Sequence, residues 1–285
     1  MFPYQKNGSL YVDRSVTILR FASCLHRLPF WVLLAIASIT AIPSQAFSPA
    51  VGKAAGTFLL HGSKAFSQAL PEAKIAQLAS VAKKPGGTKV VGDELGRLNL
   101  PNDVLEDTFA RILVFQGHVP ESEALGWMRR LTGVDGFRAA MRKSMGASPA
   151  NTIGHLNEVR IADNAAQGNF KVRGIGVPFK DPYKKGITDI DVLLEKRGQQ
   201  IAIEAKDYPS NATFPLDAFR ADMLTLDQYR IANPQKQVLT VFAITNKPNS
   251  PDVWRLLQAA AEQHKVEVLV GSPEDLMFQI PLLLK

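Results

Sequence analysis

The chain has 285 residues, of which 46% are hydrophobic and 21% charged, the composition of one large or two small globular domains. Its single cysteine, Cys24, excludes an intramolecular disulfide and any cysteine-rich metal site. The net charge of +7 belongs to the first 150 residues, because acidic and basic side chains balance in residues 151–285. Basic charge of this kind suggests a polyanionic partner. No GxSxG, HExxH, P-loop or GxGxxG motif is present, so nothing supports a serine hydrolase, a zinc protease or a nucleotide-binding enzyme.

Residues 1–46 have the three parts of a secretory signal peptide. Four basic residues precede the uncharged run Phe30–Ile42, and the small-residue pattern Ser44-Gln45-Ala46 follows it. The run is shorter than the roughly 20 residues that a membrane-spanning helix needs. We therefore expect a secreted or periplasmic protein. An uncleaved inner-membrane anchor, with membrane association through residues 30–42, is the alternative.

Residues 47–150 form a predicted helical region that contains a linker at 83–92. After the linker, one helix is expected from Asn102 or Asp103, one from Pro120 and one capped by Asp135. The last two helices carry a basic cluster, which consists of Arg129, Arg130, Arg138, Arg142 and Lys143. Such a cluster suits either phosphate contacts with nucleic acid or a solvated helix face, and the solvated face is favoured.

A β-hairpin is predicted at residues 186–206. Ile187–Leu194 and Gln200–Ala205 are rich in β-branched and aliphatic residues, as strands are. The charged, glycine-containing stretch between them has turn chemistry, and we place the turn centre between Arg197 and Gly198. The alternation along both strands predicts one apolar face for the core and one charged face.

The charged face of this hairpin collects three carboxylates and one ammonium. The expected register places Asp191 opposite Glu204 and Asp189 opposite Lys206. Two facing carboxylates repel each other unless a cation lies between them, and carboxylate oxygens suit Mg²⁺ or Mn²⁺. These groups are therefore suited to metal-assisted phosphodiester hydrolysis. A solvated sheet face with cross-strand ion pairs is the structural alternative.

The pattern Asp191, a spacer of 12 residues, then Glu204-Ala205-Lys206 resembles the motif of the PD-(D/E)xK nuclease superfamily, which has the restriction-endonuclease-like fold. The literal Pro-Asp is absent, since Ile190 precedes the aspartate. The resemblance covers roughly residues 151–270. It implies that Asp191 and Glu204 bind Mg²⁺ or Mn²⁺ and that Lys206 positions or activates the attacking water. Asp189 takes the place of Asp191 if the turn is off-centre by one pair.

Two further residues enter through this resemblance. Glu158 lies on a predicted helix at 154–164 and resembles the acidic residue that often completes the metal site in the family. Gln228 resembles the glutamine or lysine that members often place behind the catalytic strands. For both, an ordinary surface position on a helix is the alternative.

The elements of residues 151–285 follow the order that the family implies. We expect helix 154–164, strand 169–177, the hairpin, helix Leu216–Ala232, strand Gln237–Ile244, helix 251–264, strand 266–270 and a helix from Pro273. The predicted fold class is α/β, a restriction-endonuclease-like mixed sheet flanked by helices with an α-β-β-β-α-β core, preceded by the helical region.

The expected function is a Mg²⁺- or Mn²⁺-dependent endonuclease that hydrolyses phosphodiester bonds of DNA or of RNA, including tRNA. Behind a secretion signal, such an enzyme scavenges nutrients or acts as a toxin against other cells, and the layout resembles polymorphic toxins. A toxin role implies an immunity or inhibitor protein as a partner. The alternative function is a non-catalytic module that keeps the nuclease fold and binds nucleic acid or a protein.

Overall fold

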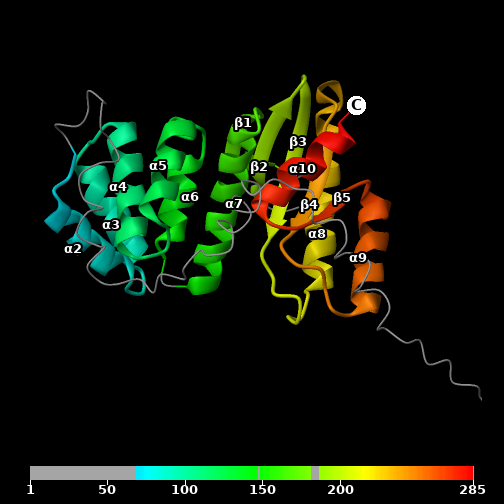
Figure 1. Cartoon of the computed structure of the whole chain (residues 1–285), viewed down its shortest axis with the longest axis horizontal. Helices are drawn as coiled ribbons and strands as arrows, with labels where there is room; N and C mark the ends of the chain where they lie inside the picture. Colours follow the sequence, from blue (N-terminus) through cyan, green and yellow to red (C-terminus); the bar gives the residue numbers. More distant parts are fainter. Residues whose placement is uncertain (1–68, 147, 181–185, 285) are drawn as a thin grey trace, which may run out of the picture. The chain divides into compact units, whose positions relative to one another are not determined.

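The computed structural model describes residues 69–146, 148–180 and 186–284 (Figure 1). The predicted signal peptide, the membrane anchor at 30–42 and the first part of the helical region therefore lie outside the described residues. Within the described ranges, no helix is long and apolar enough to cross a membrane. All of these ranges belong to a single compact unit.

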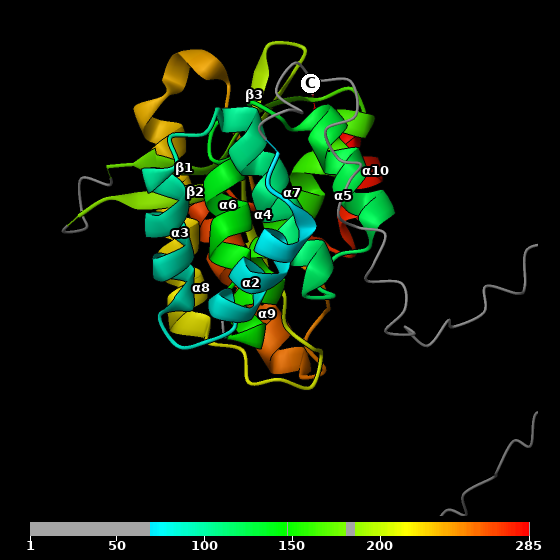
Figure 2. The same cartoon turned by 90° about the vertical axis from the view of Figure 1, so that its left-hand side faces the viewer.

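Within residues 69–146, five helices precede α7 (Pro149–Gln167), and they pack side by side (Figure 2). They are α2 (Glu72–Ala82), α3 (Gly87–Arg97), α4 (Asn102–Phe115), α5 (Glu121–Arg130) and α6 (Phe137–Ser144). The three predicted helices are confirmed as α4, α5 and α6, although the residue before α6 is Gly136 and not Asp135.

The prediction of a linker at 83–92 is wrong for residues 87–92, which belong to helix α3. Gly86 has a φ of +72°, which turns the chain after α2, and α3 begins at the next residue. Val91 and Leu95 of α3 are buried, so their contacts with the core favour a helix in a stretch whose composition is typical of a loop.

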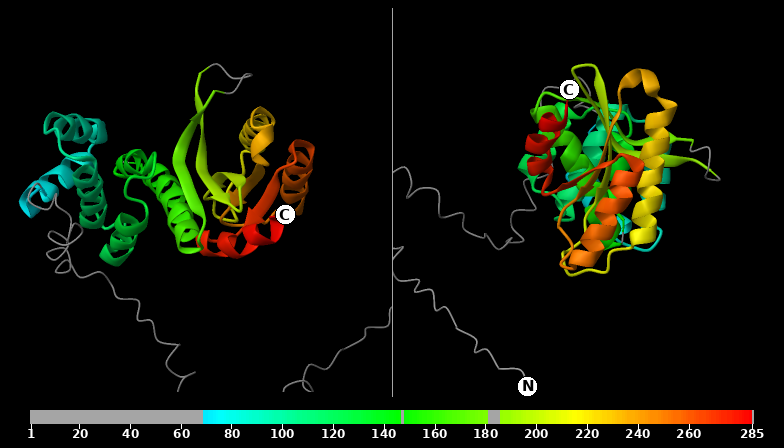
Figure 3. Two further views of the ribbon diagram at one scale, coloured as in Figure 1. Left: turned by 90° about the horizontal axis from the view of Figure 1, so that it is seen from above. Right: turned by 90° about the vertical axis from the view of Figure 1, so that its right-hand side faces the viewer.

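The remaining elements form a five-stranded mixed sheet with helices on both faces (Figure 3). They are α7 (Pro149–Gln167), β1 (Lys171–Phe179), β2 (Thr188–Lys196), β3 (Gln199–Lys206), α8 (Leu216–Ala232), a short 3₁₀ turn at Pro234–Lys236, β4 (Leu239–Ile244), α9 (Pro251–His264), β5 (Glu267–Val270) and α10 (Pro273–Leu283). The strand order is β1-β2-β3-β4-β5, antiparallel up to β3 and parallel from β3 to β5. The predicted α/β fold class is confirmed, and the sheet is consistent with the restriction-endonuclease-like fold.

The hairpin has the predicted register from its turn as far as Val192 and Ile203, whereas the expected pairs of Asp191 with Glu204 and of Asp189 with Lys206 lie beyond the paired stretch. Val192 pairs with Ile203, and Leu194 pairs with Ile201. Arg197 and Gly198 both have positive φ, at +54° and +80°, as a two-residue type I′ turn requires. This turn matches the right-handed twist of the strands and fixes which residues face each other.

Both faces of the sheet are buried, which corrects the expectation of one apolar and one charged face. Val192 and Ile203 join a hydrophobic cluster that includes α7 and the helical region. Leu193 and Ala202, on the predicted charged face, join a second cluster beneath α8 and α9, and so does Ile190. Because helices cover both faces, the polar side chains of the hairpin lie toward its two ends, and the motif residues lie at the end opposite the turn.

Helices α2–α6 share one hydrophobic cluster with α7 and one face of the sheet. Trp127 of α5 and Phe137 of α6 are fully buried in it. Where α6 begins, Gly136 has a φ of +81°, and a Cβ there would stand 1.7 Å from the carbonyl oxygen of Ile175 on β1. A glycine at this position therefore allows the backbones of α6 and β1 to approach each other closely.

Candidate active site

The motif residues gather at the end of the hairpin opposite its turn. Asp191 lies in the first half of β2, while Glu204 and Lys206 end β3, so the antiparallel pairing brings them together. Glu204 is only 7% exposed. Helix α7 contributes Glu158 from one side, and α8 contributes Asp222 from the other.

Asp191 is held by the backbone of the neighbouring strand. The amide of Ala205 donates a hydrogen bond of 2.8 Å to Asp191 Oδ2, and the backbone pairing of β2 with β3 ends just before, at Val192 and Ile203. Burial raises the pKa of Asp191 well above its ordinary value, and the carboxylates of Glu204 and Glu158 raise it further. The backbone bond thus fixes the orientation of a carboxylate that is costly to ionise.

Lys206 bridges two carboxylates. Its Nζ lies 2.5 Å from Glu204 Oε1 and 3.0 Å from Asp222 Oδ2. Burial alone would lower the pKa of Lys206, but Glu204, Asp191 and Asp222 together raise it above its ordinary value. The ammonium therefore stays protonated at neutral pH, so it acts as a fixed positive charge and as a hydrogen-bond donor.

Glu204 is ionised with difficulty despite this partner. Burial raises its pKa to about 7, the ammonium of Lys206 lowers it, and the nearby carboxylates of Asp222 and Asp189 raise it. Asp191, Glu204 and Asp222 share the single ammonium of Lys206, so the site holds more carboxyl groups than one ammonium balances.

Glu158 of α7 lies within electrostatic reach of Asp191. Its side chain is 11% exposed, and its carboxylate contributes to the raised pKa of Asp191. His155, one turn earlier on α7, lies with Nδ1 2.8 Å from Glu158 Oε1. This contact orients the carboxylate, so His155 belongs to the surroundings of the site as a supporting residue.

The alternative of Asp189 for Asp191 is decided by the register. Asp189 pairs with Pro178 on β1 and leaves 47% of its side chain exposed. Its Oδ2 lies 3.6 Å from Lys143 Nζ of α6. Asp189 therefore lies at the rim of the site, with Asp191 inside.

Gln228 is not brought to the site. It lies on α8 six residues after Asp222, which places it about 120° around the helix axis and about 9 Å farther along. In the part of the chain that the structure describes, no hydrogen bond or ion pair joins it to the motif residues. Sequence reasoning missed Asp222, whose only signal was an acidic residue among the apolar positions of the predicted helix.

The donor set suits a hard divalent cation, since it consists of carboxylates. However, no group of three or more His, Cys, Asp or Glu side chains has metal-holding geometry within the described residues. Each carboxylate already has a partner: the Ala205 amide for Asp191, Lys206 for Glu204 and His155 for Glu158. A metal would have to compete with Lys206 for Glu204.

No protein-family model and no curated protein matches the sequence. Among solved structures, the chain is similar to Can2 from Sulfobacillus thermosulfidooxidans, determined in complex with cyclic tetra-adenylate. The two are 12% identical, and the match covers 73% of this chain and 55% of Can2 with a TM-score of 0.32. This chain thus spans about half the length of Can2. A likeness at this TM-score carries no argument about function, which must rest on the site itself.

Proposed function

We propose that this protein is a metal-dependent nuclease that hydrolyses phosphodiester bonds of DNA or RNA. The observation that carries the proposal is the meeting of Asp191, Glu204 and Lys206 at one buried end of the hairpin. A surface built only for solubility would expose these charges, whereas here burial makes their ionisation costly.

Asp191, Glu204 and Glu158 are the residues that would hold the metal, Mg²⁺ or Mn²⁺. When bound, such an ion supplies an activated water and charge neutralisation at the phosphate. Its fit is supported by the excess negative charge of the site, because a cation would offset the repulsion that raises the pKa of Asp191.

The protein groups have separable tasks in this proposal. The ammonium of Lys206 stays charged and donates to a phosphate oxygen, where it stabilises the charge that develops during hydrolysis. The amide of Ala205 fixes the carboxylate of Asp191, and His155 fixes that of Glu158. Asp222 holds Lys206 in place from α8.

The same geometry favours a second candidate through one specific observation. Lys206 already neutralises Glu204 and Asp222, which is the arrangement of a closed charge network. In that case the chain is a non-catalytic module with a nuclease fold. Mn²⁺ separates the two candidates, because a metal that binds the folded state raises the melting temperature, whereas a closed network shows no shift.

Export through residues 1–46 and a toxin role are further parts of the proposal. They are supported by the basic residues before Phe30–Ile42 and by the cleavage pattern that ends at Ala46. N-terminal sequencing of the protein recovered from the periplasm tests export. A mature chain that starts at residue 47 is expected, and a chain retained in the cytoplasm would contradict export and the need for an immunity protein.

The deciding experiment is cleavage of plasmid DNA and of total tRNA by the full chain, with Mg²⁺, Mn²⁺ or EDTA. Glu204→Gln is expected to lose the metal-dependent cleavage. Glu195→Gln is the matched control, because Glu195 lies on the same hairpin but pairs with Arg173. Failure of the folded wild type to cut either polymer with either metal would reject the nuclease.

A further inference from the structure

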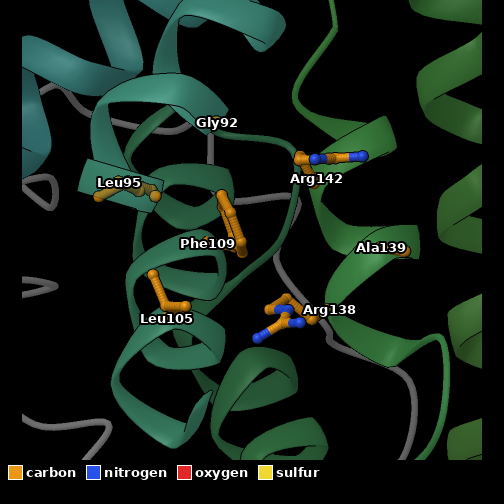
Figure 4. Close-up of a pocket in the computed structure, with 8 residues that line it drawn as sticks. Gly92, Leu95, Leu105, Phe109, Arg138, Ala139 and Arg142 are labelled. Atoms are coloured by element: carbon orange, nitrogen blue, oxygen red, sulfur yellow. The ribbon is translucent and has the colours of Figure 1, made fainter. Parts of the chain in front are cut away.

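A hollow of about 300 Å³ lies between α3, α4 and α6, away from the proposed metal site (Figure 4). Leu95, Leu105 and Phe109 give it an apolar floor, and Figure 4 shows Arg138 between α4 and α6 beside this floor. Gly96 leaves its α3 side open, since a Cβ there would meet nothing within 4 Å. The volume is at the lower end of small-molecule pockets, about 300–1,000 Å³.

Two arginines of α6 line this hollow, and both are available to an anion. Arg138 and Arg142 are one turn apart, so they lie on the same face of the helix. Both are exposed, and among the described residues neither is within ion-pair distance of a carboxylate. Among the described residues, Arg138 donates a hydrogen bond to the amide oxygen of Asn102, and its charge also partly offsets the rise that burial causes in the pKa of Glu106. The stem of Arg142 lies over Gly92, where a Cβ would be 3.5 Å from its Cδ.

The same helix reaches the rim of the candidate active site. Lys143, next to Arg142, lies with Nζ 3.6 Å from Asp189 Oδ2, and Asp189 is two residues from Asp191 on β2. Gly136 fixes α6 against β1 at its other end. The positive charges of α6 therefore run from the hollow to the candidate active site.

We propose that this hollow binds one nucleotide of a single-stranded nucleic acid, with its ring against the apolar floor and its phosphate on Arg138 and Arg142. Guanidinium groups bind phosphate in a bidentate manner and also stack on flat rings. A ligand that carries both a phosphate and a ring therefore uses both properties of the two arginines. An unpaired base is free to enter a pocket, whereas a base in a duplex is stacked. The proposal rests on the proposed function, because it places this nucleotide on the substrate strand.

The first test fills the hollow and leaves its charges unchanged. Gly96→Leu places a side chain in the open space, and Gly96→Ala is the control with the same backbone change and little added volume. Binding of a fluorescent fifteen-residue oligothymidylate is measured in EDTA, so that no cleavage occurs. We expect Gly96→Leu to weaken binding about tenfold and Gly96→Ala to change it less than twofold. Equal binding by both variants would overturn the proposal.

The second test removes the phosphate contacts. Arg138→Gln/Arg142→Gln is expected to lower the slope of log affinity against log salt by about 0.7, the value for one phosphate of a single strand. Arg220→Gln/Arg255→Gln removes the same charge from α8 and α9, where each arginine pairs with a carboxylate of its own helix, and should leave the slope unchanged. Equal slopes in the two double variants would overturn the assignment of Arg138 and Arg142.

Three further ligands identify the source of the nucleotide. The Gly96→Leu variant and the wild type should have equal affinity for a duplex of the same sequence. They should also have equal affinity for an abasic strand of the same length, because neither ligand offers an unpaired base. Displacement of the oligonucleotide by micromolar uridine monophosphate would overturn the strand assignment in favour of a free nucleotide. These measurements are independent of cleavage, so a chain that binds but does not cut rejects only the proposed nuclease. A chain that cuts but passes none of these tests rejects only the nucleotide site.

Discussion

Lys206 is the residue on which the charges of the site depend. It touches Glu204 at 2.5 Å and Asp222 at 3.0 Å, while Asp191 and Glu158 remain without an ammonium of their own. Removal of one partner from a buried charge group usually costs more than the pair contributes, because a charge is left without compensation. Removal of a buried carboxylate that has no ammonium partner should instead stabilise the fold, because it relieves repulsion between like charges.

Asp191→Asn is therefore expected to stabilise the fold while it abolishes activity. The amide oxygen of asparagine still accepts the bond from Ala205, but the repulsion with Glu204 and Glu158 is lost. In EDTA, the gain should be about 1–2 kcal/mol, or a rise of roughly 5 °C in melting temperature. Cleavage should fall about 100-fold or more. The control Asp217→Asn, at a fully exposed position on α8, should change neither quantity, and a destabilised Asp191→Asn would contradict this account.

The stability of the metal-free chain should decrease as the pH rises from about 4.5 to about 7. Glu204 has a pKa of about 7 in the folded chain, chiefly because of burial, against an ordinary value of 4.5. Between these values the folded state keeps a proton that the unfolded state has lost, so the free energy of unfolding falls by at most roughly 3 kcal/mol. Urea denaturation across this range should show a flatter profile for Glu204→Gln than for Glu195→Gln. Parallel profiles for the two variants would show that Glu204 is not the cause.

Elements that begin or end at a clear capping, proline or turn signal could be predicted from the sequence. The bounds of α8 and α9 follow from Asn233-Pro234 and from Ser250-Pro251, and the hairpin register follows from its turn. Helix α3 could not be predicted, because its glycines and lysines favour a loop unless Val91 and Leu95 find a core. Asp222 was missed for a similar reason. Only the packing of α8 on β3 brings its carboxylate to Lys206, and the spacing of the two residues along the chain does not predict this contact.

Gly136 permits an approach between elements that a side chain would prevent. Gly136→Ala places a Cβ against the carbonyl of Ile175, whereas Gly133→Ala has a similar positive φ, +79°, in open space. Gly133→Ala should cost about 1 kcal/mol of stability, the cost of the left-handed conformation alone. Gly136→Ala should cost at least about 2 kcal/mol more, measured by urea denaturation. Equal losses in the two variants would mean that the contact between α6 and β1 is not tight.

At the scale of the whole molecule, the helical region and the sheet are joined by a shared core. Residues of α2–α6, α7 and the inner face of the sheet belong to the same hydrophobic cluster, in which Trp127 and Phe137 are fully buried. The order of elements in residues 151–285 predicted the α/β class, because helices between strands imply a covered mixed sheet. The docking of the helical region on that sheet depends on shape complementarity between distant residues, which the order of elements does not encode.

This shared core predicts one cooperative unfolding transition. In Trp31→Phe/Trp254→Phe, the remaining indole of Trp127 reports the helical region, while far-ultraviolet circular dichroism reports all helices. The two urea midpoints should coincide within about 0.2 M, as two-state behaviour requires. An earlier midpoint for the fluorescence of Trp127 would show that α2–α6 unfold separately from the sheet.

The place of β3 in the sheet has a consequence for how the site loses its order. This strand carries Glu204 and Lys206, and it is paired with β4 as far as Lys206. On its other side it is paired with β2 as far as Ile203, beyond which the Ala205 amide donates to Asp191, and helices lie above and below. Strands in such a position open only when the rest of the molecule opens, so the amides around Glu204 should be among the last to exchange with deuterium. Local opening of the edge strands should therefore leave the candidate catalytic groups in place. Heat or denaturant should abolish their alignment only when the whole fold is lost.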